Sequence, residues 1–295
     1  MLPIVLYCKS YRTDLKRVKR LAESIQQFNT ENIPFFVSIP ATDHALFSQY
    51  LIGLSVNLIT DEAIISSNSS IDKERFADLP GHIGQQIVKS EFWRTDHSVS
   101  YLCLDSDCFF IKPFNSRDFL TEDDTPYTII DEGRDLIYSC LSKGKMRILA
   151  NYKRESESIQ VHMGRDGKHY NFGPNCPIWD RRVWKSFNDL FLQPQKLSFL
   201  DIIVLSPNEQ RWYGEALLKY KAIDLYPSQP FFKMYHYAWQ RRRDLRSGIG
   251  LKQLAEIYSG VSYQSAWERQ MDWPHEGGSS LSKLGRRIRT LLGRT

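Results

Sequence analysis

The sequence predicts a single Rossmann-like α/β domain with a mixed, mostly parallel sheet, helices on both faces and a helical C-terminal tail. Short apolar runs alternate with segments of helical periodicity, which is the pattern of successive strand-helix units. Charged residues follow a strand-like run at the point where open α/β sheets bind ligands. The 295 residues are 42% hydrophobic, which is ample for a packed core.

The first half of the chain contains three such units. The apolar run at 3–8 predicts a strand, and LKRVKRLAESIQQF at 15–28 predicts a helix. Further strands are predicted at 33–40 and 56–60, with a helix-like segment at 41–51 between them. This alternation favours parallel strands covered on both faces.

A polar stretch at 66–81 precedes a helical segment at 82–95 and the strand 98–105, SVSYLCLD. That strand ends in the motif Asp105-Ser106-Asp107. Two residues apart in extended backbone, Asp105 and Asp107 face the same side, so both can face one divalent cation. Buried carboxylates need a partner, and hard oxygen ligands suit Mg²⁺ or Mn²⁺. We therefore expect a metal site at Asp105 and Asp107.

The net charge of +5 comes from the C-terminus. The last fifteen residues, LSKLGRRIRTLLGRT, carry five basic residues and no acid, which leaves the rest of the chain neutral. A broad basic face for nucleic acid is therefore not expected. Leucine and isoleucine recur at helical spacing between the basic residues of 279–295, which predicts either a helix that binds an anionic membrane surface or a helix packed on the domain.

The start MLPIVLYCKS has neither the basic lead nor the cleavage site of a signal peptide, and no apolar run approaches the length of a membrane span. Five scattered cysteines without a CxxC pair indicate reduced, buried thiols. We therefore expect a cytoplasmic protein, peripheral on the inner face of the cell membrane if the tail binds lipid.

The strand ending in Asp-x-Asp, followed by FFIKPF, resembles the metal-binding motif of nucleotide-sugar-dependent glycosyltransferases with the GT-A fold, including bacterial transferases of surface-polysaccharide assembly. The resemblance implies a GT-A domain at 1–245, with a nucleotide-binding half at 1–110 and an acceptor half at 111–245. Residues 246–295 would then be a helical extension. It also implies a Mn²⁺ or Mg²⁺ cofactor, a nucleotide-sugar donor, with UDP favoured, and a saccharide or lipid-linked saccharide acceptor.

The same resemblance assigns candidate donor-binding residues. Lys9, Ser10 and Arg12 follow the first strand, where the family holds the nucleotide, although a plain polar turn would look the same. Gln85 and Lys89 share one face of the helix that leads into the motif, where solvated residues are the alternative. Ser106, inside the motif, is a further donor contact.

Acceptor contacts and a general base are also implied. Asn171 and Trp179 lie in a segment that resembles an acceptor-side loop, where Trp179 could stack on a sugar ring or lie in the core. Glu209 begins the predicted helix after SPN and matches the family's general base; helix capping is its alternative role, and Glu215 is the reserve candidate.

A histidine near the end of the resembling region completes the expected site. His236 follows an aromatic strand and matches the family's third metal ligand, while a satisfied core histidine is the alternative. Lys233 and Arg241 are the corresponding diphosphate candidates.

The resulting expectation is a hexosyltransferase-like enzyme of polysaccharide or glycolipid synthesis, with inversion favoured because Glu209 is available. Two other classes stay open. One is a metal-dependent nucleotidyl- or phosphotransferase, against which the absence of GxxxxGKS and GxGxxG motifs counts. The other is a noncatalytic peripheral membrane protein with the same fold.

Overall fold

A computed structural model describes residues 1–142, 144–173, 176–236 and 238–264. The strands are β1 (Leu2–Lys9), β2 (Phe35–Ile39), β3 (Asn57–Thr60), β4 (Ser98–Leu104), β5 (Cys108–Phe110), β6 (Tyr127–Ile129), β7 (Ile178–Asp180), β8 (Tyr226–Ser228), β9 (Phe232–Tyr235) and β10 (Gly260–Tyr263). The helices are α1 (Leu15–Phe28), α2 (His44–Tyr50), α3 (Asp61–Ser66), α4 (Lys73–Ala77), α5 (Gly81–Glu91), α6 (Arg134–Ser142), α7 (Met146–Met163), α8 (Arg181–Phe187), α9 (Phe199–Leu205), α10 (Glu209–Tyr220), α11 (Ala238–Arg246) and α12 (Leu251–Ala255).

The central sheet has the strand order β3-β2-β1-β4-β7. The first four strands run parallel, and β7 pairs antiparallel with β4. This confirms the predicted α/β fold with a mixed, mostly parallel sheet. The helix predicted at 15–28 coincides with α1, because its apolar positions recur on the face that packs against the sheet.

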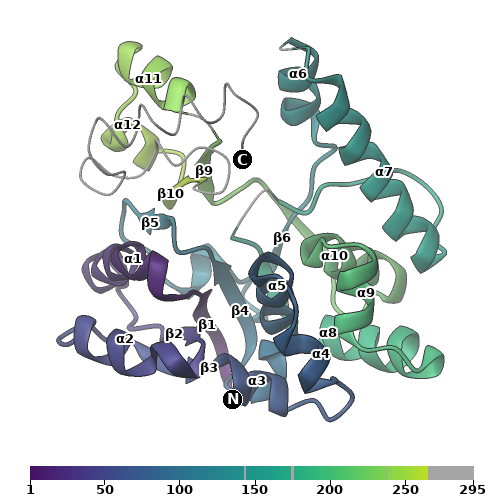
Figure 1. The fold of residues 1–295 in the computed structure, drawn as a ribbon. Coiled ribbons are helices and arrows are strands. Elements are labelled where there is room, and N and C mark those ends of the chain that lie inside the picture. Colours follow the sequence, from purple (N-terminus) through teal and green to yellow (C-terminus); the bar gives the residue numbers. More distant parts are fainter. Residues whose placement is uncertain (143, 174–175, 237, 265–295) are drawn as a thin grey trace, which may run out of the picture.

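Two cores cover the two faces of this sheet. Successive residues of β1 point to opposite faces, so Val5 and Tyr7 pack with α5, α8 and α10, whereas Leu6 and Cys8 pack with α1 and α2. Figure 1 shows these two groups of helices on opposite sides of the strands. All five cysteines are free and buried, as expected.

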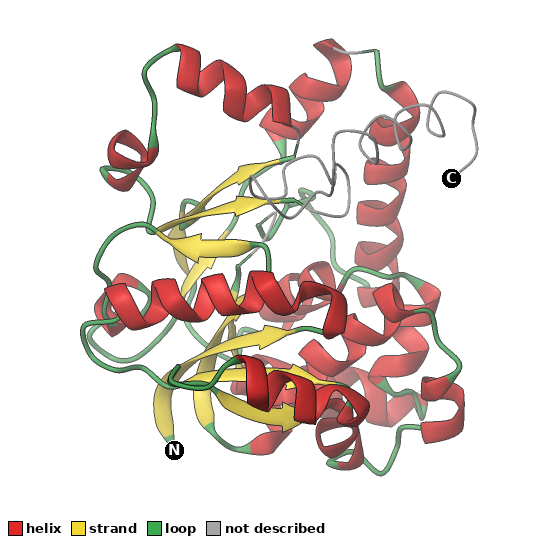
Figure 2. Cartoon of the chain, turned by 60° about the vertical axis from the view of Figure 1, so that its left-hand side comes forward, coloured by secondary structure: helices red, strands yellow, loops and turns green. Residues whose placement is uncertain are grey.

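A second sheet, β5-β10-β9, brings the C-terminal part of the described chain back onto the segment after the Asp-x-Asp motif. Strand β10 pairs antiparallel with β5 and parallel with β9. Figure 2 shows these strands as a group separate from the central sheet. The range 246–295, expected to be helical, thus contains a strand, and the expected boundary at residue 245 is crossed by strand pairing. The predicted tail at 279–295 lies outside the described residues.

A short helix, α4, lies in the stretch 66–81 that the sequence indicated only as polar. Helix α4 begins after Asp72, whose side chain accepts hydrogen bonds from the backbone N–H groups of Glu74 and Arg75. Within the described part of the chain, no helix is long and apolar enough to cross a membrane.

Candidate active site

A cleft of about 1190 Å³ opens at the carboxyl ends of the parallel strands. Lys9 and Ser10 border it at the end of β1, Asp61 borders it after β3, and Asp105 and Asp107 border it after β4. Parallel strands end at one edge of a sheet, so residues distant in the sequence meet there. Of the predicted site residues, Lys9, Ser10, Gln85, Asp105, Ser106 and Asp107 are brought together at this cleft.

The Asp-x-Asp motif forms the turn between β4 and β5. The backbone N–H of Cys108 donates to the carbonyl oxygen of Asp105 at 3.1 Å, which closes the turn. The two carboxylates differ in exposure: the side chain of Asp105 is 34% exposed, whereas Asp107 is buried. Asp105 is therefore the more accessible of the two from the cleft.

Lys89 holds Asp105 from α5. Its ammonium donates to Oδ1 of Asp105 at 2.7 Å and lies 3.9 Å from Oε1 of Glu209. Burial alone would lower the pKa of Lys89, but Asp105, Cys103 and Glu209 together raise it well above its usual range. Lys89 is therefore a fixed cation between two carboxylates.

Glu209 is the first residue of α10, and its cap is the preceding Asn208, whose side chain accepts from the N–H of Arg211. Glu209 is thus not needed as the cap. Burial raises the pKa of Glu209, against the opposing effect of Lys89. Its carboxylate does not border the cleft itself, but contacts the Lys89–Asp105 pair from the α10 side.

Asp107 is held by the C-terminal strand. The hydroxyl of Ser262, in β10, donates to Oδ1 of Asp107 at 3.1 Å, and the N–H of Tyr263 donates to the Asp107 carbonyl oxygen at 3.1 Å. Gln264, the next residue, borders the cleft. The end of the described chain therefore completes this wall of the site.

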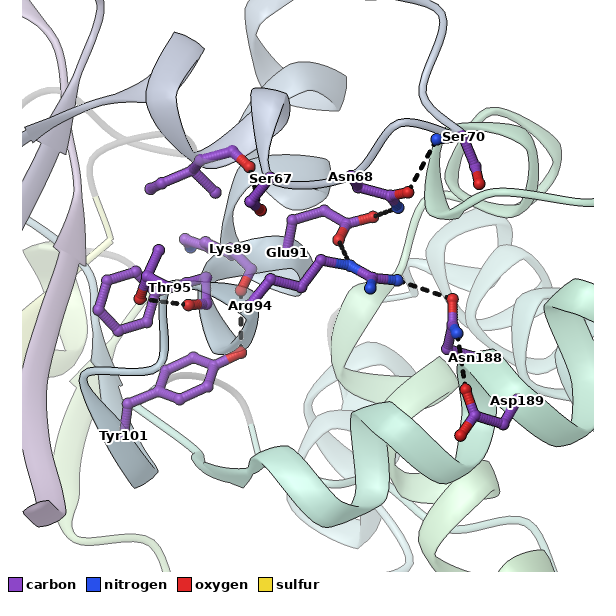
Figure 3. A network of polar contacts seen from close by, with 12 residues as sticks. Ser67, Asn68, Ser70, Lys89, Glu91, Arg94, Thr95, Tyr101, Asn188 and Asp189 are labelled. Atoms are coloured by element: carbon purple, nitrogen blue, oxygen red, sulfur yellow. Dashed lines mark hydrogen bonds and ion pairs between the residues drawn. The ribbon is translucent and has the colours of Figure 1, made fainter. Parts of the chain in front are cut away.

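A buried polar network anchors α5 just after Lys89. Glu91 accepts hydrogen bonds from Asn68 at 2.7 Å and from Arg94 at 2.6 Å, and Arg94 also donates to Asn188 at 2.7 Å. Figure 3 shows this chain of contacts crossing from α5 to the helical segment of Asn188 and Asp189. Burial raises the pKa of Glu91 to about 7, although Arg94 and Asn68 oppose the shift. The network fixes the end of α5 and thereby the position of Lys89.

Asp61 is a cleft residue that the sequence analysis missed. Its Oδ2 lies 2.8 Å from Nζ of Lys9, and burial raises its pKa to about 6. The signal was present, since Asp61 directly follows the predicted strand 56–60 at the same edge as Asp105. Arg12, by contrast, does not border the cleft; its guanidinium pairs with Asp43 at 2.6 Å.

The predicted diphosphate residues Lys233 and Arg241 do not border the cleft either. Nζ of Lys233 lies 5.7 Å from the ring centroid of Tyr235, and the guanidinium of Arg241 lies 5.3 Å from that of Tyr263. Their positive charges therefore rest on aromatic faces of the second sheet.

His236 is not placed as a third metal ligand. Its backbone N–H donates to Gln240, and burial lowers the pKa of its imidazole. Across the described residues, no group of three or more His, Cys, Asp or Glu side chains is arranged to hold a metal. His236 therefore does not join Asp105 and Asp107 in such a cluster.

The two carboxylates alone still fit a magnesium-type ion. Mg²⁺ is commonly held by one or two carboxylates, with waters and substrate phosphates filling the other positions. Asp105 and Asp107 both border the cleft, and the more exposed Asp105 has only one oxygen bonded to Lys89. The donor set fits a hard divalent cation that is completed by a phosphorylated ligand.

The remaining candidates lie elsewhere. Trp179 is 1% exposed and packs in the core against Tyr101 and Trp184, so it cannot stack on a sugar in this arrangement. Glu215 is buried and paired with Arg165, with 2.9 Å between Oε1 and Nη2, which leaves no base free there. Asn171 is half-buried and bonds Asp131 through its backbone, away from the cleft.

Comparison with solved structures shows the class of fold. A structure of the galactosyltransferase LgtC in complex with donor and acceptor sugar analogues superposes with a TM-score of 0.51 at 13% identity, covering 98% of this chain and 95% of that one. A structure of an active-site mutant of LgtC gives the same values. The protein therefore has the GT-A fold.

Residues 1–240 match the model of a family described as "Family of unknown function (DUF6492)", and the chain belongs to that family. A search among curated proteins finds no significant match.

Proposed function

We propose that this protein is a metal-dependent glycosyltransferase that moves a sugar from a nucleoside-diphosphate sugar to a hydroxyl of a glycan or lipid-linked saccharide. One observation carries the proposal: Asp105 and Asp107 border a large cleft at the carboxyl end of β4 in a GT-A fold. UDP is the favoured nucleotide. The proposed setting is polysaccharide or glycolipid synthesis at the cytoplasmic face of the membrane.

The donor would lie along the cleft. Lys9 and Ser10, at the end of β1, and Gln85, on α5, would contact the nucleotide, because these three residues border the same space as the carboxylates. Asp105 and Asp107 would hold Mn²⁺ or Mg²⁺ against the diphosphate. A divalent cation bound there would supply positive charge beside the phosphate leaving group.

Lys89 would keep Asp105 in place before and after the donor binds. Its ammonium is buried and bonded to Asp105, so the orientation of that carboxylate does not depend on the ligand. Fixed charges of this kind need no reorganisation during a reaction. Lys89 is thus proposed as a positioning residue.

Glu209 is the proposed general base of an inverting reaction. Because Glu209 lies beside the donor cleft and does not border it, this role requires the acceptor hydroxyl to approach from the α10 side. The carboxylate would then accept the proton of that hydroxyl as its oxygen attacks the anomeric carbon and the bond to phosphate breaks. Its raised pKa makes it a stronger base than an exposed glutamate. The rate should therefore increase as the pH rises through this pKa, because only the carboxylate form accepts a proton.

The experiment is a screen for nucleoside-diphosphate release from UDP-, GDP- and other nucleotide-sugars, with Mn²⁺, with Mg²⁺ and with chelator. Wild-type protein should release one nucleoside diphosphate in a metal-dependent manner. Asp107→Ala should remove that release while thermal unfolding shows the variant to be folded. Equal release by wild type and the folded variant would overturn the proposal.

A further inference from the structure

The surface formed by residues 241–257, here the α11–α12 surface, exposes aliphatic and cationic side chains together. Leu245, Ile249, Leu251 and Ile257 are 49%, 39%, 44% and 73% exposed. Scattered single exposed aliphatics are ordinary, but four within thirteen residues of one another are a local concentration. Leu245 lies in α11, Ile249 in the turn after it, Leu251 in α12 and Ile257 just after α12; the two helices lie together at one end of the molecule in Figure 1.

The cationic residues of this surface are also exposed. They are Arg241, Arg242, Arg243, Arg246 and Lys252. The range contains two acidic residues, and one of them, Asp244, is buried and accepts a hydrogen bond from the hydroxyl of Tyr235 at 2.9 Å. Asp244 also pairs with Arg243 at 3.3 Å, and Arg241 lies over the ring of Tyr263. The positive charge of the surface therefore rests mainly on Arg242, Arg246 and Lys252, with Glu256 as the one exposed acid within 241–257.

Asp244 fixes which side of α11 faces outward. Its contact with Tyr235 turns that side of the helix toward β9. At about 100° per residue, positions two before and two after Asp244 point away from β9. Arg242 and Arg246 thus project from the outer side, with Leu245 beside them.

We propose that the α11–α12 surface docks on an anionic lipid bilayer. Aliphatic side chains next to arginine and lysine match the two layers of such a surface, since the aliphatic groups enter the acyl boundary while the cations remain at the headgroups. A soluble polyanion would be attracted by the cations but would give the four aliphatic side chains no apolar partner. The bilayer is therefore the occupant that accounts for both features.

Sedimentation of the full-length protein with lipid vesicles tests this directly. Phosphatidylcholine vesicles are compared with vesicles that also contain phosphatidylglycerol. Two variants probe the surface: Arg242→Glu with Arg246→Glu, and Leu251→Ser with Ile257→Ser. Matched controls lie elsewhere: Lys196→Glu with Lys221→Glu for charge, and Ile52→Ser, at a position 79% exposed, for the aliphatic change.

Wild type and both controls should bind the anionic vesicles and bind the neutral vesicles at least tenfold less. Each surface variant should bind the anionic vesicles at least about tenfold less than the wild type does, while its thermal unfolding temperature matches that of the wild type. Because every variant keeps residues 279–295, the loss is due to the α11–α12 surface. Wild-type binding by either surface variant would overturn the proposal. A second outcome would also overturn it: light scattering shows that the wild type is a dimer, and the surface variants become monomers while their vesicle binding stays unchanged.

Discussion

Lys89 and Asp105 form an ion pair at the wall of the cleft, with 2.7 Å between Nζ and Oδ1. The lysine is buried in α5 and the aspartate ends the strand β4, so the pair joins a helix to the carboxyl end of the sheet. Glu209 lies 3.9 Å from the same ammonium. One cation therefore connects the proposed metal ligand with the proposed base.

Removing this cation should damage both stability and activity. Lys89→Met keeps most of the side chain's length but leaves Asp105 and Glu209 without their shared partner. We expect the free energy of unfolding to fall by about 1–3 kcal/mol, which is the usual cost when a buried polar group loses its partner. The effect should not exceed this range, because Asp105 is partly exposed and solvent screens its charge. Urea unfolding measures this change. Lys196→Met, at an exposed position, is the control, and equal stability of the two variants would contradict the assigned role of Lys89.

Ser262 should matter although it is distant from the motif in the sequence. Ser262→Ala removes the hydroxyl that donates to Asp107. The free energy of unfolding should fall by about 1.5–3 kcal/mol, the usual contribution of a hydrogen bond to a charged group. Catalytic turnover should also fall, because Asp107 loses its orientation. Ser259→Ala changes a buried serine on the same segment and should leave turnover unchanged. If Ser262→Ala and Ser259→Ala show the same turnover, then β10 does not orient Asp107.

Trp179 should behave as a core residue. Trp179→Ala is expected to lower the free energy of unfolding by about 3–5 kcal/mol, since the ring packs among Tyr101, Trp184 and Tyr213. Trp179→Phe should cost clearly less. Tyr138→Ala, at a side chain 73% exposed, is the matched control and should cost little. A fully stable Trp179→Ala variant with weakened acceptor binding would instead restore the sugar-stacking role.

The stability of the protein should depend on the ionisation of Glu91. Burial raises its pKa from 4.5 to about 7, so the folded protein holds the proton more tightly than the unfolded chain does. Its contribution to stability is therefore fully present below about pH 4.5 and is lost as the pH rises through 7. Glu91→Gln removes this titration, so its stability relative to wild type should increase with pH across that window. Urea unfolding of both proteins at several pH values measures the difference, and a constant difference would contradict the raised pKa.

Local patterns predicted the fold well because they reflect local physics. A continuous apolar run defined β1, helical periodicity defined α1, and the position of Asp105 after a strand placed it at the ligand-binding edge of the sheet. The same rule would have found Asp61. These features depend on residues that are close together in the sequence.

The rest of the site depends on contacts between distant segments. Ser262 reaches Asp107 across 155 positions, which no local pattern encodes. The sequence leaves Trp179 as either a sugar-stacking or a core residue, because an aromatic ring suits both, and only the packing around it distinguishes them. His236 followed a strand as expected, but the path of that strand does not bring it into a metal cluster with the two aspartates.

Calorimetric titration with UDP, GDP and CMP, each with Mn²⁺ and with chelator, tests the central claim most directly. Wild-type protein should bind one nucleotide in the presence of the metal, bind it much more weakly with chelator, and lose that binding in Asp107→Ala. If a folded wild-type protein binds none of the three, or binds equally well with chelator and in Asp107→Ala, then Asp105 and Asp107 do not form a nucleotide-sugar site.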